Sequence, residues 1–249
     1  QGPMLLFCRG PSFQPSMLTM DGDGRWDRGR VLVEGGGERP YIKFEADDEG
    51  TVHFAFTDGH PRLEPGNSIY YARLADQAFY RADGTRVGSA ETPLLWRQAD
   101  LVYDGAAGGG RAWVWDIAVD PDGHPVIVFA VFPELTDHRY HYARWDGERW
   151  QETEIAHAGS WFPRGGEDEN RFEPHYSGGI ALDHEAPDVV YMSRPVDGVY
   201  EIERWETEDG GESWTQSSAP EVGTGAVIRD ITHCGCRVSF FGLGDTSIV

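Results

Sequence analysis

The sequence has little cysteine, little lysine and no long hydrophobic run. Its three cysteines, Cys8, Cys234 and Cys236, are an odd number and too few for a disulfide framework in 249 residues. No apolar stretch approaches the length of a membrane-spanning helix, and no basic segment followed by an apolar run indicates a signal peptide. Lysine favours helices, and both lysine and helical periodicity are scarce. These absences argue against a disulfide scaffold and against a helical protein.

Positive charge is also in short supply. The chain has 42 acidic and 21 basic residues, which gives a formal charge of −21. A nucleic-acid or anionic-membrane partner needs a basic face, so we expect neither. An anionic ligand would need a local basic cluster that overcomes the general negative field.

The residues do not require a cofactor, and we predict no metal site. Acidic turns rich in Gly and Asp could bind structural Ca²⁺, but no EF-hand loop is present. His233, Cys234 and Cys236 could bind Zn²⁺, although three neighbouring ligands are too few for a closed zinc site. Cys8 lies in an apolar run and is expected to be a core residue.

The chain is instead rich in aromatics, which make up 12% of it, and in turn residues, with 32 Gly and 15 Pro. Three segments resemble one another, each with two or three short runs of Val, Ile, Tyr and Phe bounded by Asp, Gly or Pro. Such runs predict β-strands joined by hairpins. The first runs of the three units begin at Tyr41, Val114 and Ser177.

A repeat of this kind predicts an all-β protein, a β-propeller of four-stranded blades, because one unit cannot bury both of its faces alone. We expect three complete blades plus partial blades at both ends. The partial first blade spans residues 1–37, and the complete blades span about 38–100, 111–160 and 172–220. The propeller blades together span residues 1–225. Residues 226–249 lose the pattern and form an atypical C-terminal segment.

Some turns match the pattern Ser/Thr-x-Asp-x-Gly-x-Ser/Thr-Trp, called the Asp-box. Thr207–Trp214 fits at every position, Thr19–Trp26 fits loosely, and Trp145–Trp150 is a shortened form. In such a turn the Asp carboxylate accepts backbone N–H groups and Gly takes the positive φ angle. We therefore expect these carboxylates to be structural and not catalytic.

The chain resembles the BNR-repeat family of the sialidase-like propeller superfamily in several segments. The resemblance is carried by Arg39–Phe44, Val52–Arg62, Asn67–Tyr71, Phe79–Gly84 and Pro174–Asp183, and it covers about residues 1–220. Some similar proteins are seven-bladed polysaccharide lyases that act on rhamnose–uronate polymers such as ulvan. The resemblance implies that the chain is a fragment of such a propeller, that its ligand is a polysaccharide or oligosaccharide, and that the protein is secreted or periplasmic.

In a propeller, the starts of the innermost strands and the loops between the second and third strands meet at one end of the axis. The catalytic candidates collected there are His60, Tyr176, Arg194 and His138. The candidates for substrate binding are Asn67, Arg62, Tyr41, Trp113, Trp115 and His175. Each also has a plain structural interpretation: His60 could shape a turn, His138 could be a solvated loop residue, and Arg194 could pair with an acid in a neighbouring blade. The other histidines, His184 among them, are expected to be incidental.

If the lyase resemblance holds, the reaction is β-elimination at a uronic acid. The resemblance implies that Arg194 and a histidine such as His60 neutralise the carboxylate, and that Tyr176 or a histidine removes the C5 proton. Two alternatives stay open. A sialidase-like hydrolase would need a three-arginine clamp, for which Arg39, Arg62 and Arg194 are candidates, but the Arg-Ile-Pro signature is absent. A non-catalytic glycan-binding propeller would stack sugars on Trp113, Trp115 and Tyr41.

Overall fold

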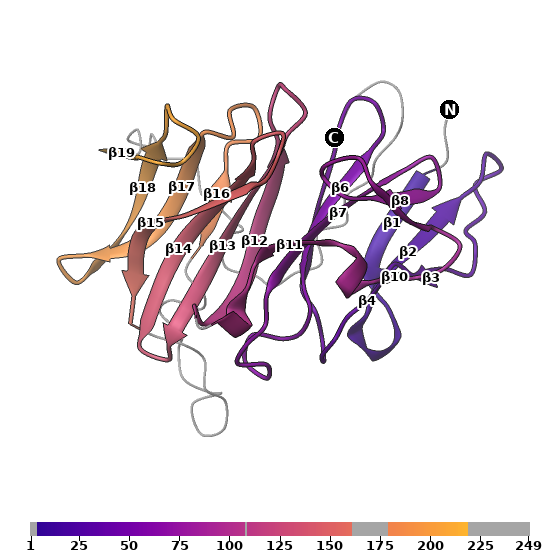
Figure 1. The fold of residues 1–249 in the computed structure, drawn as a ribbon, viewed down its shortest axis with the longest axis horizontal. Helices are drawn as coiled ribbons and strands as arrows, with labels where there is room; N and C mark the ends of the chain where they lie inside the picture. The colour runs from indigo at the N-terminus through magenta and orange to yellow at the C-terminus, as the bar shows by residue number, and fades with distance from the viewer. Residues whose placement is uncertain (1–3, 108, 161–178, 219–249) are drawn as a thin grey trace.

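The computed structural model describes residues 4–107, 109–160 and 179–218, and this part of the chain is almost entirely β-structure (Figure 1). Three short 3₁₀ helices interrupt it: η1 (Pro11–Phe13), η2 (Trp96–Gln98) and η3 (Gly105–Ala107). None of the described helices is long and apolar enough to cross a membrane. The all-β prediction is confirmed.

The N-terminal region contributes two small sheets. One contains β1 (Met4–Arg9), β2 (Pro15–Met20) and β3 (Arg30–Val31) in antiparallel order. The other pairs β4 (Val33–Glu34) with β10 (Leu94–Leu95) in parallel.

The next sheet is built on the first repeat unit. Its path runs through β5 (Ile42–Ala46), β6 (Val52–Thr57), β7 (Ile69–Ala75), β8 (Ala78–Tyr80) and β9 (Arg86–Ser89). A further strand, β11 (Asp100–Tyr103), pairs with the other end of β7. The fourth strand of this unit is therefore β11, which ends three residues beyond the expected end of the blade at residue 100. Strands β8 and β9 form an additional hairpin.

The second and third units each form one four-stranded antiparallel sheet. The second contains β12 (Arg111–Val119), β13 (Pro125–Glu134), β14 (Asp137–Trp145) and β15 (Trp150–Gly159). The third contains β16 (Ile180–Leu182), β17 (Val189–Val196), β18 (Val199–Glu206) and β19 (Thr215–Ser218). The sheets stand side by side (Figure 1), as blades would, and β12 packs against both β5 and β16. A closed ring and its number of blades stay predictions.

The hydrophobic core lies between successive sheets, and β13 shows how. Side chains alternate across a strand, so Val126, Val128, Ala130 and Phe132 face the third unit while Ile127, Phe129 and Val131 face the first. A strand buried on both faces reads as a continuous apolar run, which is what Pro125–Phe132 shows in sequence.

Aspartates close the tight turns between strands. Asp47 Oδ1 accepts the backbone N–H groups of Glu49 and Thr51 at 3.0 and 2.8 Å, and Asp120 does the same in the next unit. In the turn before β19, Asp209 accepts the Ser213 N–H at 2.8 Å, and Gly210 has a φ angle of 73°. Hydrogen bonds inside this turn hold the pKa of Asp209 at about 2. The Asp209 carboxylate therefore accepts hydrogen bonds within its own turn, and Asp47 and Asp120, which lie outside the predicted Asp-boxes, do the same.

Candidate functional site

Three aromatic rings meet at the N-terminal end of β5. Tyr41 immediately precedes β5, Trp113 lies on β12, and His60 lies in the loop between β6 and β7. The Tyr41 ring centroid is 5.2 Å from that of His60 and 4.9 Å from that of Trp113, and the His60 and Trp113 centroids are 5.5 Å apart. The structure therefore brings together one predicted catalytic residue and two predicted binding residues.

The hydrogen bonds of His60 determine its tautomer. The backbone N–H of Arg62 donates to His60 Nδ1 at 3.0 Å. Because an amide N–H can only donate, Nδ1 must be unprotonated, and the proton of the neutral ring lies on Nε2. That nitrogen is 3.4 Å from the Tyr41 hydroxyl oxygen, which places a neutral imidazole N–H beside a phenol.

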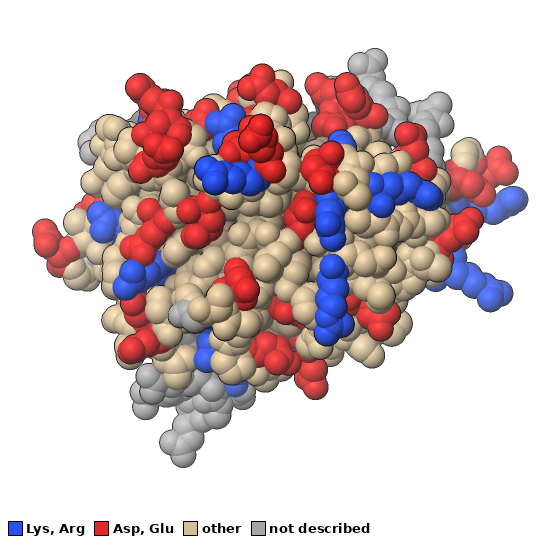
Figure 2. All heavy atoms as spheres, viewed as in Figure 1, with Lys and Arg blue, Asp and Glu red and all other residues tan. Residues whose placement is uncertain are grey.

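Burial and, after it, the positive charges of Arg9, Arg39 and Arg62 together lower the pKa of His60 to about 4. We call Arg9, Arg39 and Arg62 the arginine cluster. The Arg9 guanidinium lies 4.4 Å from the centroid of the Tyr41 ring, and the Arg39 guanidinium lies 4.4 Å from that of Phe13. On the face drawn in Figure 2, acidic side chains are spread widely, with basic side chains scattered among them. A basic cluster in a chain of charge −21 is the feature that an anionic ligand would require.

Asn67 occupies a structural position. It is 2% exposed, and its side-chain amide donates to the Ala112 carbonyl at 2.6 Å and accepts the Ala112 N–H at 3.1 Å. Both polar ends of the amide are therefore used to join the β6–β7 loop to β12. Substrate binding by Asn67 stays a prediction that these hydrogen bonds do not favour.

His138 lies inside the sheet and not in a solvated loop. The hairpin between β13 and β14 is short, so residue 138 falls on β14, and its side chain is 0% exposed. Its ring stacks on Phe132 with centroids 4.6 Å apart and meets Tyr140 edge-on at 5.1 Å. The loop interpretation was wrong, and a ring buried in this way does not reach a polymer in this structure.

Arg194 on β17 pairs with Glu203 on the adjacent β18. Its Nε and Nη2 donate to the two carboxylate oxygens of Glu203, the Nη2 bond measuring 3.0 Å. An ion pair is therefore present, but the acid lies in the same sheet as Arg194 and not in a neighbouring blade as the structural alternative expected. Carboxylate neutralisation by Arg194 stays a prediction from the resemblance.

Of the remaining candidates, the structure describes Trp115 but not His175 or Tyr176. Trp115 on β12 is half-buried, and its Nε1 has no hydrogen-bond partner among the described residues. Its ring centroid lies 5.8 Å from the Lys43 ammonium. His175 and Tyr176 lie outside the described residues, as do His233, Cys234 and Cys236. Within the part of the chain that the structure describes, no group of three potential metal ligands is present.

Sequence reasoning missed Arg9 and the partners of His184. Arg9 ends the first strand and reaches the site only because the N-terminal sheet packs against β5. His184 follows β16, and its ring nitrogens contact Glu45 Oε2 at 2.8 Å and Asp116 Oδ2 at 3.1 Å. These hydrogen bonds, that to Asp116 first, raise the pKa of His184 to about 10. Glu45 and Asp116 lie on the first strands of the first and second units, and His184 lies in the turn after the first strand of the third. No local sequence pattern shows a contact between residues so far apart.

Comparison with known proteins decides the family. The profile described as "BNR repeat-containing family member" matches residues 8–158. The chain belongs to this family. It is 29% identical over 105 residues to an ulvan lyase of Nonlabens ulvanivorans, an alignment that covers 40% of this chain and 19% of the relative.

Solved structures agree on the fold of this BNR repeat-containing chain. A PL25 ulvan lyase bound to -[GlcA(1-4)Rha3S]- matches with a TM-score of 0.61 and 12% identity, over 87% of this chain and 52% of the lyase. The polysaccharide lyase Uly1 matches with a TM-score of 0.51 and 14% identity, over 90% of this chain and 48% of the lyase. The chain thus spans about half the length of these structures and a smaller part of the curated relative.

Proposed function

We propose that this chain belongs to a polysaccharide lyase-like protein that binds a uronate-containing polysaccharide at the arginine cluster and cleaves it by β-elimination. The observation that carries the proposal is the arginine cluster around the neutral His60 and Tyr41 in a strongly acidic chain. The relationship to an ulvan lyase supports the same reaction class. Export to the periplasm or the cell exterior goes with a polymeric substrate and is part of the proposal.

The arginine cluster would prepare the substrate for proton loss. The C5 proton of a uronate is weakly acidic while the neighbouring carboxylate keeps its full negative charge. Guanidinium groups form strong charge-assisted hydrogen bonds to carboxylates, and they stabilise the negative charge that develops as the proton leaves. Arg39 and Arg62, whose positive charges both act on His60, are the residues we assign to this role.

Tyr41 and His60 would serve the leaving group. A base takes the C5 proton, a C4–C5 double bond forms, the C4–O bond breaks, and the leaving oxygen takes a proton. We assign that proton to the Tyr41 hydroxyl. The resulting phenolate would accept the hydrogen bond from His60 Nε2 and lie beside the Arg9 guanidinium, whose present distance from the ring centroid is 4.4 Å. Tyr176 stays our candidate for the base.

The proposal is tested by the products formed from uronate-containing polysaccharides. Elimination leaves an unsaturated sugar that absorbs ultraviolet light and weighs one water less than the hydrolysis product. We expect unsaturated oligosaccharides from the wild-type chain. Saturated products would favour a hydrolase, and binding of the polymer with no product would favour a glycan-binding protein; either result contradicts the lyase assignment.

A further inference from the structure

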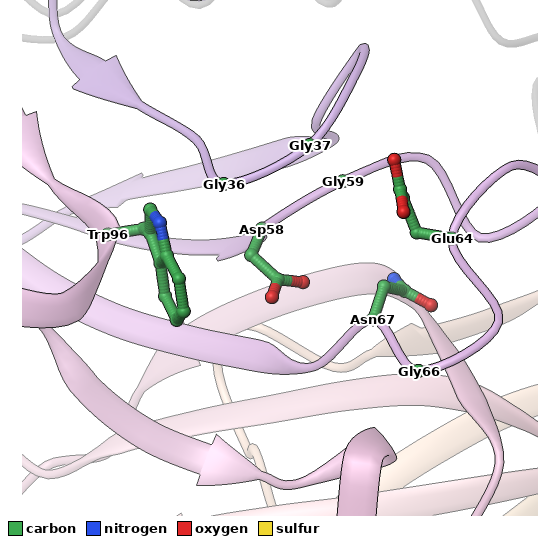
Figure 3. Close-up of a pocket in the computed structure, with 8 residues that line it drawn as sticks. All are labelled: Gly36, Gly37, Asp58, Gly59, Glu64, Gly66, Asn67 and Trp96. Atoms are coloured by element: carbon green, nitrogen blue, oxygen red, sulfur yellow. The ribbon is translucent and has the colours of Figure 1, made fainter.

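A pocket of about 250 Å³ is formed in part by the loop that carries His60. It is lined by Asp58, Glu64, Asn67 and Trp96 and by the glycines 36, 37, 59 and 66 (Figure 3). In Figure 3 Trp96 stands on one side, Asn67 and Glu64 on the other, and Asp58 lies between them. A pocket of this size is smaller than the roughly 300–1,000 Å³ of sites for drug-sized ligands, so it suits a single sugar ring.

The side chains that line the pocket include an aromatic hydrogen-bond donor, the indole N–H of Trp96, and the carboxylate acceptors of Asp58 and Glu64. Trp96 Nε1–H and the Glu64 carboxylate have no hydrogen-bond partner among the described residues, whereas one oxygen of Asp58 accepts the Ser68 N–H at 2.9 Å. The Asn67 amide is already used by Ala112. A metal ion or an ammonium group would use the acceptors and leave the indole donor unused. A hydroxyl group both donates and accepts, so it can satisfy both kinds of group.

Glycines bring the backbone close to these side chains. A Cβ atom on Gly36 would lie 2.7 Å from Trp96 Nε1, and one on Gly37 would lie 2.8 Å from Glu64 Oε1. Trp96 is also held from outside, since the Arg97 guanidinium lies 4.2 Å from its ring centroid and Tyr70 meets it edge-on at 5.2 Å. The indole edge is therefore fixed in place where only glycine fits beside it.

We propose that this pocket binds an uncharged, unsulfated sugar ring through its hydroxyl groups. The carboxylates of Asp58 and Glu64 would accept from hydroxyls, and Trp96 Nε1–H would donate to one. Two carboxylates repel a uronate or a sulfate ester, so the pocket selects against the charged sugars that the arginine cluster attracts.

The loop of residues 58–67 contributes residues to both sites. Its residues His60 and Arg62 belong to the arginine-cluster site, while Asp58 and Glu64 face the pocket. A polymer in which charged and neutral sugars alternate could place one of each in the two sites. This inference deepens the proposed function. Binding of the polymer across both sites rests on that function, whereas binding of a free neutral sugar to the pocket is independent of it.

The test uses methyl α-rhamnoside, methyl β-glucoside and glucuronate as probes, with saturation-transfer NMR on the wild-type chain. We expect the neutral glycosides to bind and Gly36→Ala and Glu64→Gln each to weaken that binding by about tenfold, the loss of roughly one strong hydrogen bond. Gly22→Ala is the matched control, because its Cβ would meet nothing within 4 Å. Thermal melting establishes that each variant is folded, and Glu64→Gln, which conserves shape, covers the case in which Gly36→Ala does not fold.

The inference is overturned if neither neutral glycoside binds, or if folded Gly36→Ala and Glu64→Gln bind like Gly22→Ala. The two proposals fail separately. If Arg62→Ala loses uronate binding and keeps neutral-sugar binding, both sites are supported. If the wild-type chain binds neutral sugars but no uronate, the pocket proposal stands and the lyase assignment fails.

Discussion

His60 is the residue on which the account depends most, because two forces keep it neutral. Burial and the arginine cluster both oppose its protonation, and the Arg62 N–H occupies the nitrogen that a second proton would need. A neutral imidazole that donates from Nε2 can support a phenol or phenolate throughout the neutral pH range.

We predict that His60 titrates near pH 4 and not near its ordinary value of 6.5. Since the unfolded chain then binds the proton first, this residue lowers the stability of the fold as pH falls from about 6.5 towards 4. NMR titration of the histidine ring signals, assigned with His60→Gln, measures the value. A midpoint near 6.5 would contradict the environment described for this ring.

His184 should behave in the opposite way. Its raised pKa means that the folded state holds the proton more tightly, so its contribution to stability is complete below pH 6.5 and is lost as pH rises through about 10. We expect His184→Gln to lower the melting temperature at pH 6 and to have little effect above pH 10. His157→Gln is the comparison, because the 59% exposed ring of His157 contacts one carboxylate, that of Asp137 at 3.0 Å, and not two. Equal effects of His184→Gln at both pH values would contradict the ion-pair role.

At the scale of elements, Asn67 holds a loop to the neighbouring sheet. Asn67→Ala would leave the buried N–H and C=O of Ala112 without partners, and each such loss costs about 1–3 kcal/mol. We therefore predict a marked fall in the free energy of unfolding, measured by urea denaturation, relative to Gln77→Ala on an exposed turn. A stable Asn67→Ala chain with weaker sugar binding would instead restore the predicted binding role.

The sequence predicts the strands better than it predicts the site. Strand periodicity and Asp-Gly turns are local, so β12, β13 and β14 could be located from short runs. His138 was misplaced because the Asp-His sequence after Glu134 resembles a loop, while its burial depends on Phe132 in the facing strand. Contacts such as Glu45 with His184 join residues 139 positions apart, and no spacing rule reports them.

For the molecule as a whole, the arginine cluster stands out against a net charge of −21. We predict that binding of uronate oligosaccharides weakens as salt is added, because the attraction is between exposed charges. Arg39→Ala should weaken it further, whereas Arg86→Ala, an exposed arginine on β9, should not. Calorimetric titration at two salt concentrations measures both effects. Salt-independent binding, or equal effects of the two substitutions, would place the uronate elsewhere.

The lyase assignment itself is tested most directly by Tyr41→Phe, which removes one hydroxyl and keeps the ring that packs on Trp113. The measurement is the rate of unsaturated product formation from a uronate-containing polysaccharide, together with the affinity for that polymer. We predict that Tyr41→Phe loses at least about a hundredfold in rate, the usual range for a general acid, while affinity changes little. An unchanged rate of elimination in Tyr41→Phe, or no unsaturated product from the wild-type chain, would contradict the account.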